Sequence, residues 1–377
     1  MLAAIVLSGS LLCACGGSGS STAPPSPTAP GTPVAAAPTI STSTANGAQN
    51  GAMIVTLSSA TAGATIYYTL DGSTPTTASK QYEAPILVAS NITVNAMATA
   101  SGFSASTVAS KSFMPNIASG TLVWSDEFTN SGVVNGQPNP STWTYDIGTN
   151  CCGNNELETY CAWASTTGPC NPANPNAYIG TDGFLHVVAQ QPTSGTAVYA
   201  SARLKSQGLF SFQYGRIEAR MMLPESQGMW PAFWLLGDNI VTNPWPACGE
   251  LDMMEHIDGS NPPIGGKGPG YDWMQSSIHG TSLNGGVPYT VTGFSAAAWH
   301  TYGMIWTKGQ IQFYIDDPST IYETFTPATQ TGTWPFDSGP EFILLNLAVG
   351  GSWPGSPDST TVFPSQMLVD YVRIYSN

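Results

Sequence analysis

The chain has 377 residues, enough for two or three domains, but only 8% of them are charged, against roughly 25% in an average soluble protein. The few charges are mostly acidic and give a formal net charge of −14 at pH 7, which argues against nucleic acid or an anionic membrane surface as a partner and favours an uncharged ligand. With 40 Gly, 30 Pro and no run of about eighteen apolar residues, the composition predicts a mostly β protein without a membrane-spanning helix.

The N-terminal segment has the pattern of an export signal. Leu2–Cys15 is an apolar run that ends in small residues and is too short to span a bilayer, so residues 1–15 are predicted to be a signal peptide. The end of this run, Leu12-Cys13-Ala14-Cys15, resembles a lipobox, which implies acylation of Cys15 and an exported lipoprotein at the bacterial outer membrane or cell surface. The Lys or Arg that usually precedes such a run is missing. A start upstream of Met1, or a non-lipidated signal of a secreted or periplasmic protein, therefore stays open.

The next stretch cannot form a packed core. Residues 16–39 contain only Gly, Ser, Thr, Ala, Pro and Val, and the first charged residue of the chain is Asp71. Such a segment buries too little apolar area to offset the entropy lost on ordering. Residues 16–37 are therefore predicted to be a disordered linker.

Residues 38–114 read as a small immunoglobulin-like β-sandwich module. The strands predicted in it are Met53–Ser58, Thr65–Leu70, Pro85–Ala89, Ile92–Thr99 and Thr107–Phe113. The stretch Ala64–Pro75, with a turn at Asp71-Gly72, resembles the immunoglobulin-like module at the C-terminus of chitobiases. Tyr67 and Tyr68 could present a ring to sugar or could divide between core and surface. We interpret the module as a separable spacer, with glycan binding as the alternative.

From about residue 118 to residue 377 the sequence predicts two antiparallel sheets packed face to face. Tyr214–Leu223 alternates charged and apolar residues, as a strand with one buried face does. Thr301–Trp306 and Ile311–Asp316 are predicted to form a hairpin, and Met367–Ser376 is predicted to be a strand tied into a sheet.

Three acidic residues are concentrated in the stretch Gly249–His256. Glu250 and Asp252 share one face of a strand, but the third acid, Glu255, comes one residue later than strict alternation requires. A bulge with one extra residue would bring Glu255 back beside the other two. Folding alone gives no reason to crowd three acids, whereas hydrolysis of a glycosidic bond needs paired carboxyls. An acidic strand that simply faces water is the alternative.

Seven blocks in the sequence resemble glycoside hydrolase family 16, in the form typical of bacterial laminarinases, which are endo-β-1,3-glucanases. Besides the acidic strand, the blocks that carry the resemblance are Val123–Phe128, Asn154–Glu156, Tyr214–Arg220, Trp230–Trp234, His279-Gly280, Asn346–Gly351 and Val369–Arg373. The resemblance implies an all-β fold, a concanavalin A-like β-jelly-roll sandwich, for residues 118–377. It also implies that Glu250 is the nucleophile, Glu255 the acid/base, and Asp252 a hydrogen-bonding partner of the nucleophile.

Candidate sugar contacts flank the acidic strand. Trp230 and Trp234 are four residues apart and can lie on one face of a strand as flat platforms, although either could instead be a core residue. By resemblance, Asn155, His279 and Arg203 also line the cleft. Asn155 could instead cap a turn, and His279 could instead be a structural histidine.

The family resemblance further implies a structural calcium ion, held by Asp370, Glu127 and the carbonyl of Gly183. Hard oxygen ligands suit calcium, while a surface Asp without a metal is the alternative. No motif for a catalytic metal or a nucleotide occurs, so no catalytic cofactor is expected.

Five cysteines remain once the two in the signal segment are removed. They are Cys151, Cys152, Cys161, Cys170 and Cys248. In an exported protein, five thiols allow two disulfides and one free cysteine. Because four of them fall within one short loop, we expect this loop to be stapled and to border the cleft.

Together these observations favour an exported, monomeric, retaining endo-β-1,3-glucanase acting on β-glucan, with no nucleic-acid partner and no membrane contact beyond a lipid anchor. The alternatives are a family 16 hydrolase of mixed-linkage glucan or of a galactan, and a non-catalytic glucan-binding protein. The presence of all three acids disfavours the non-catalytic alternative.

Overall fold

The computed structural model describes residues 31–44, 47–129, 134–149, 153–193, 195–257, 272–290 and 293–377. These ranges are built from strands, and none of them holds a helix long and apolar enough to cross a membrane. The predicted signal peptide with Cys15, most of the predicted linker, and Cys151 and Cys152 lie outside the described residues.

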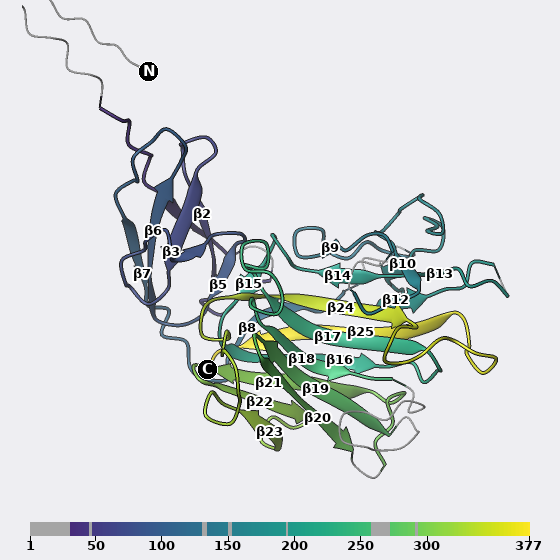
Figure 1. Ribbon diagram of the computed structural model, residues 1–377. Helices are drawn as coiled ribbons and strands as arrows, with labels where there is room; N and C mark the ends of the chain where they lie inside the picture. Colours follow the sequence, from purple (N-terminus) through teal and green to yellow (C-terminus); the bar gives the residue numbers. More distant parts are fainter. Residues whose placement is uncertain are drawn as a thin grey trace, which may run out of the picture.

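Most strands belong to two sheets that lie face to face (Figure 1). The first, called the long sheet, has the order β1 (Thr39–Ser43), β2 (Met53–Ser58), β5 (Ile86–Val88), β15 (Ser211–Phe212), β24 (Glu341–Val349), β17 (Met229–Gly237), β18 (Glu250–Glu255), β19 (Trp273–Gly280) and β20 (Leu283–Thr290), with β14 (Arg203–Lys205) and β9 (Thr144–Tyr145) beside β24. The second has the order β11 (Ala177–Ile179), β12 (Leu185–Ala189), β25 (Ser365–Tyr375), β16 (Gly215–Met222), β21 (His300–Thr307), β22 (Gln310–Ile315) and β23 (Ile321–Phe325), with β8 (Leu122–Asp126) beside β25.

The main core lies between these two sheets. In β16, Ile217, Ala219 and Met221 are fully buried in it, as the predicted alternation requires. Alternate residues of β17 and β24 enter the same core from the long sheet. The hairpin of β21 and β22 closes with Thr307 opposite Gln310, and β25 lies inside its sheet between β12 and β16, so both of these predictions are confirmed.

The N-terminal module has a core of its own. A four-stranded sheet, β4 (Lys80–Gln81), β3 (Thr65–Thr69), β6 (Ile92–Thr99) and β7 (Ala109–Phe113), packs over β1, β2 and β5. Tyr68 is buried in this core and Tyr67 is half-buried, which is the core-and-surface alternative. The remaining two strands, β10 (Glu158–Tyr160) and β13 (Tyr199–Ser201), form a separate parallel pair.

Candidate active site

The strand β18 contains the predicted bulge. Against β17, Phe233 pairs with Met254 and Trp234 pairs with Asp252, so Met253 has no partner. The register against β19 shifts at the same place, between Asp252 and Glu255. The side chains of Met253 and Met254 are both buried in the main core. The extra residue thus returns Glu255 to the face that carries the other two acids.

Cross-strand pairing surrounds these acids with polar neighbours. On β19, His279 pairs with Glu250, Ser277 with Asp252 and Gln275 with Glu255. The His279 Nε2 atom lies 3.2 Å from Asp252 Oδ2, and the Ser277 hydroxyl donates to Glu255 Oε2 at 3.3 Å. His279, predicted to line the cleft, therefore lies directly beside the acids.

Burial and mutual repulsion keep protons on this cluster. Burial, and next the charge of Asp252, raise the pKa of Glu250 to about 8. Burial, followed by the charges of Asp252 and Glu250, raises the pKa of Glu255 to about 8. Burial also raises the pKa of Asp252 well above its usual range, while a hydrogen bond with Glu250 opposes that rise. At neutral pH the cluster can therefore hold protonated and ionised carboxyls together.

Each outer acid has its own indole donor. The Nε1 group of Trp230 donates to Glu255 Oε1 at 3.2 Å, and that of Trp245 donates to Glu250 Oε2 at 2.5 Å. Both hydrogen bonds lower the pKa of the acceptor, because they stabilise its charged form. The Trp245 side chain is 56% exposed, so a flat ring beside Glu250 remains open to a ligand. Trp245 was not among the residues predicted for the site. Its signal was a Trp-Pro pair five residues before the acidic strand.

The two predicted platforms have different surroundings. Trp230 is half-buried, and the ring of Trp353 meets it edge-on with 5.3 Å between centroids. Trp234 lies on the same face of β17 but is only 9% exposed. The guanidinium of Arg203 covers its ring at 4.4 Å, and Asp146 in turn binds Arg203. The structure therefore favours Trp230 as a platform and the core alternative for Trp234.

A chain of hydrogen bonds runs from Trp234 to the loop that carries Asn155. Trp234 Nε1 donates to Asn346 Oδ1 at 2.8 Å, Asn346 donates to the Tyr160 hydroxyl, and this hydroxyl donates to Glu156. The exposed side chain of Asn155 donates to the Ser352 hydroxyl at 2.8 Å and makes no described contact with the acids. The sequence predicted no contact for Asn346 or Tyr160, because Asn346 finds its partners Trp234 and Tyr160 more than a hundred positions away.

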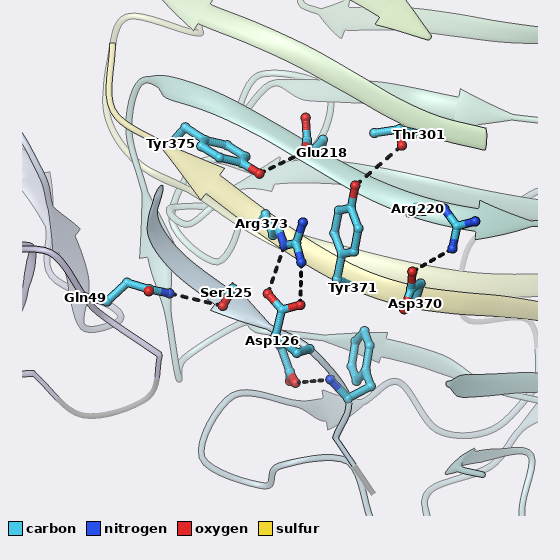
Figure 2. A network of polar contacts seen from close by, with 12 residues as sticks. Gln49, Ser125, Asp126, Glu218, Arg220, Thr301, Asp370, Tyr371, Arg373 and Tyr375 are labelled. Atoms are coloured by element: carbon cyan, nitrogen blue, oxygen red, sulfur yellow. Dashed lines mark hydrogen bonds and ion pairs between the residues drawn. The ribbon is translucent and has the colours of Figure 1, made fainter. Parts of the chain in front are cut away.

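The predicted calcium ligands are engaged by arginines. Arg373 makes two hydrogen bonds to the Glu127 carboxylate. Arg220 donates to Asp370 Oδ2 at 2.7 Å (Figure 2). Gly183 lies in the turn between β11 and β12. Both carboxylates are paired with guanidinium groups, and calcium binding stays a prediction.

One disulfide is present in the cysteine-rich loop, where the sequence predicted disulfide bonding. Cys161 and Cys170 form a disulfide with their Cα atoms 5.7 Å apart. Cys248 is a free, buried thiol just before β18, and burial raises its pKa to about 12, so it is inert rather than reactive.

Comparison with known proteins agrees with this site. Residues 174–373 match the family model of glycosyl hydrolases family 16, and residues 44–110 match that of the chitobiase/beta-hexosaminidase C-terminal domain. A beta-glucanase from Rhodothermus marinus is 36% identical over 265 residues, covering 67% of this chain and 84% of the relative. A keratan-sulfate endo-1,4-beta-galactosidase from Sphingobacterium multivorum is 32% identical over 262 residues, covering 67% of this chain but only 54% of that protein. The solved catalytic domain of an endo-1,3-beta-glucanase (laminarinase) from Thermotoga petrophila aligns with a TM-score of 0.56 at 32% identity, over 69% of this chain and 99% of that one.

Paired carboxyls on one sheet face, here flanked by indole rings, are what hydrolysis of a glycosidic bond requires, and the family match identifies the protein as a glycoside hydrolase. The chain belongs to family 16 of the glycosyl hydrolases and carries an N-terminal chitobiase C-terminal-type module.

Proposed function

We propose that the protein is a retaining endo-β-1,3-glucanase in which Glu250 is the nucleophile and Glu255 the acid/base. The observation that carries this proposal is the bulge at Met253, which brings Glu255 to the face of Glu250 and Asp252. Similarity to a beta-glucanase and to a laminarinase catalytic domain supports a β-glucan substrate.

In the first step, the ionised carboxylate of Glu250 attacks the anomeric carbon while Glu255 donates its proton to the leaving glycosidic oxygen. The indole of Trp245 supports the negative charge on Glu250, and the raised pKa of Glu255 keeps its proton available. In the second step, Glu255 accepts a proton from water, which attacks the glycosyl-enzyme and releases Glu250. Two displacements restore the original configuration. Asp252 shares a hydrogen bond with Glu250. This hydrogen bond stabilises the Glu250 carboxylate when it is ionised, which is before the attack and after its release.

The test is to incubate the full chain with laminarin, lichenan, agarose and carrageenan, to size the products, and to follow the first-formed anomer by NMR. We expect oligosaccharides from laminarin with the β-anomer released first. Initial release of the α-anomer would refute the assigned roles. Products from agarose or carrageenan without products from laminarin would instead favour a galactan hydrolase, the alternative that the similarity to a galactosidase supports.

We also propose export through residues 1–15 with acylation at Cys15, on the strength of the lipobox-like sequence alone. Growth with labelled palmitate should label the wild-type chain, and the substitution Cys15→Ser should abolish the label. A labelled Cys15→Ser variant, or an unlabelled wild type, would contradict lipidation.

A further inference from the structure

The N-terminal module shares a sheet with the candidate active site. Strand β5 of the module lies parallel to β15, with Ile86 opposite Ser211 and Leu87 opposite Phe212 (Figure 1). The Ser211 amide donates to the Pro85 carbonyl at 2.9 Å. Since β15 pairs with β24, and β24 with β17, only three strands separate β5 from the acidic strand β18.

A second junction joins the module to β8 in the other sheet. The Gln49 amide donates to the Val123 carbonyl at 3.0 Å, and the Gln49 side chain donates to the Ser125 hydroxyl at 3.1 Å (Figure 2). Gly47 has a φ of +85°, and a Cβ there would collide with the carbonyl oxygen of Ser125, so this approach requires glycine. The module is therefore fastened to both sheets.

The strands of the module also bury apolar side chains in the main core. Val55 and Leu57 of β2 point into the module's own core, whereas Ile54, directly before Val55, belongs to the core of the two large sheets. Strand β5 behaves in the same way, with Leu87 in the main core. These strands are therefore buried on both faces, as in the interior of one domain and unlike a tethered spacer.

Lys80 is the module's charged contact with this region. Its Nζ atom lies 2.7 Å from Asp238 Oδ1, with the two side chains 9% and 3% exposed, and it donates to the Pro340 carbonyl at 3.2 Å. Asp238 directly follows β17, and Pro340 directly precedes β24. Lys80 thus bridges the ends of the two neighbouring strands that lie between the module and β18.

Electrostatics connect this bridge to the acids. Burial raises the pKa of Asp238, and it raises the pKa of Glu341 to about 8. The positive charge of Lys80 lowers the pKa of both groups and so opposes these rises. The charge of Glu341 in turn contributes to the raised pKa of Asp252. A buried carboxylate that loses its cation is strongly destabilised.

We propose that the module is an integral part of the catalytic unit and that Lys80 is a positioning residue, which holds the ends of β17 and β24 in register beside the acidic strand. The kinetic part of this inference rests on the proposed function. It differs from the separable spacer predicted from the sequence, and the module's role here is structural rather than sugar-binding.

The test uses the full chain with the substitution Lys80→Met, which keeps the length of the side chain and removes its charge. The matched control is Lys111→Met, because Lys111 belongs to the same module and is exposed. We expect Lys80→Met to lower the melting temperature by roughly 5–10 °C and to reduce kcat on soluble laminarin about tenfold with little change in KM, because it acts through the acids rather than on bound sugar. Lys111→Met should match the wild type in all three measurements.

Adding Asp238→Asn to Lys80→Met should restore at least half of the lost melting temperature and part of kcat, because it removes the carboxylate that was left unpaired. A Lys80→Met variant that behaves like Lys111→Met would overturn the proposal, as would a double variant no better than Lys80→Met. A rise in KM for insoluble glucan alone would instead indicate a sugar-binding module. If the wild type cleaves no glucan, the proposed function fails, while the melting temperatures still decide whether Lys80 fastens the module.

Discussion

Two carboxyls of the same chemical type have different surroundings in this site. Glu250 meets an exposed indole and a histidine, and Glu255 meets a half-buried indole and a serine hydroxyl. If the roles differ as proposed, the two alanine variants should fail in different ways.

With an activated aryl glycoside as substrate, Glu255→Ala should still form the covalent intermediate, because such a leaving group needs little protonation. Azide should then restore turnover and give the β-glycosyl azide. In Glu250→Ala, azide should attack directly and give the α-product, at an initial activity several orders of magnitude below the wild type. Product NMR checks both outcomes, and a β-azide from Glu250→Ala would contradict the assignment.

The two indole donors should act on opposite limbs of the pH profile of kcat/KM. The acidic limb reports ionisation of the nucleophile, and the alkaline limb reports deprotonation of the acid. Trp245→Phe removes a donor that lowers the pKa of Glu250, so the acidic limb should move to higher pH. Trp230→Phe does the same for Glu255, so the alkaline limb should move to higher pH. Shifts on the same limb in both variants would show that the carboxyl roles are not divided in this way.

At the scale of a strand, the sequence was informative wherever a local period could be followed. The bulge was predictable because strict alternation fails at one residue, and both methionines that follow Asp252 are apolar enough for the core. The Trp-Pro pair marks Trp245 as a loop residue, but no periodicity there indicates that its ring lies beside Glu250. The pairing of β5 with β15 also left no local signal, because it joins residues more than a hundred positions apart.

The predicted calcium site tests how β25 is fastened to its neighbours β8 and β16. If a cation binds near Asp370 and Glu127, adding chelator should lower the melting temperature and calcium should restore it. If the two arginine pairs are sufficient, chelator should change nothing, and Asp370→Ala should cost only about 0–1 kcal/mol, as for a partly exposed ion pair. Calorimetry with chelator on the wild type and on Asp370→Ala separates the two cases. A chelator response that survives in Asp370→Ala would locate any cation elsewhere.

At the scale of the whole molecule, the chain has few charges and buries several of its acids. Burial raises the pKa of Glu250, Glu255, Glu158 and Glu341 to about 8, and that of Asp252 well above its usual range. These groups extend from the candidate active site to the junction with the module. They would therefore couple the stability of the whole sandwich to pH.

The direction of that coupling follows from proton binding. In the unfolded chain glutamates ionise near pH 4–4.5, whereas in the folded chain the buried Glu158 and Glu341, which lie outside the catalytic cluster, keep their protons until about pH 8, so the folded state binds more protons between these values. Their contribution to stability is complete below the unfolded pKa and is lost as the pH rises through the folded pKa. The free energy of unfolding should therefore fall as the pH rises from about 4.5 to about 8. Melting temperatures measured from pH 5 to pH 9 should decline most steeply in the lower part of this range and level off above pH 8. Glu341→Gln should reduce the slope without touching the sugar-binding face, and a melting temperature that rises from pH 5 to pH 8 would contradict this account.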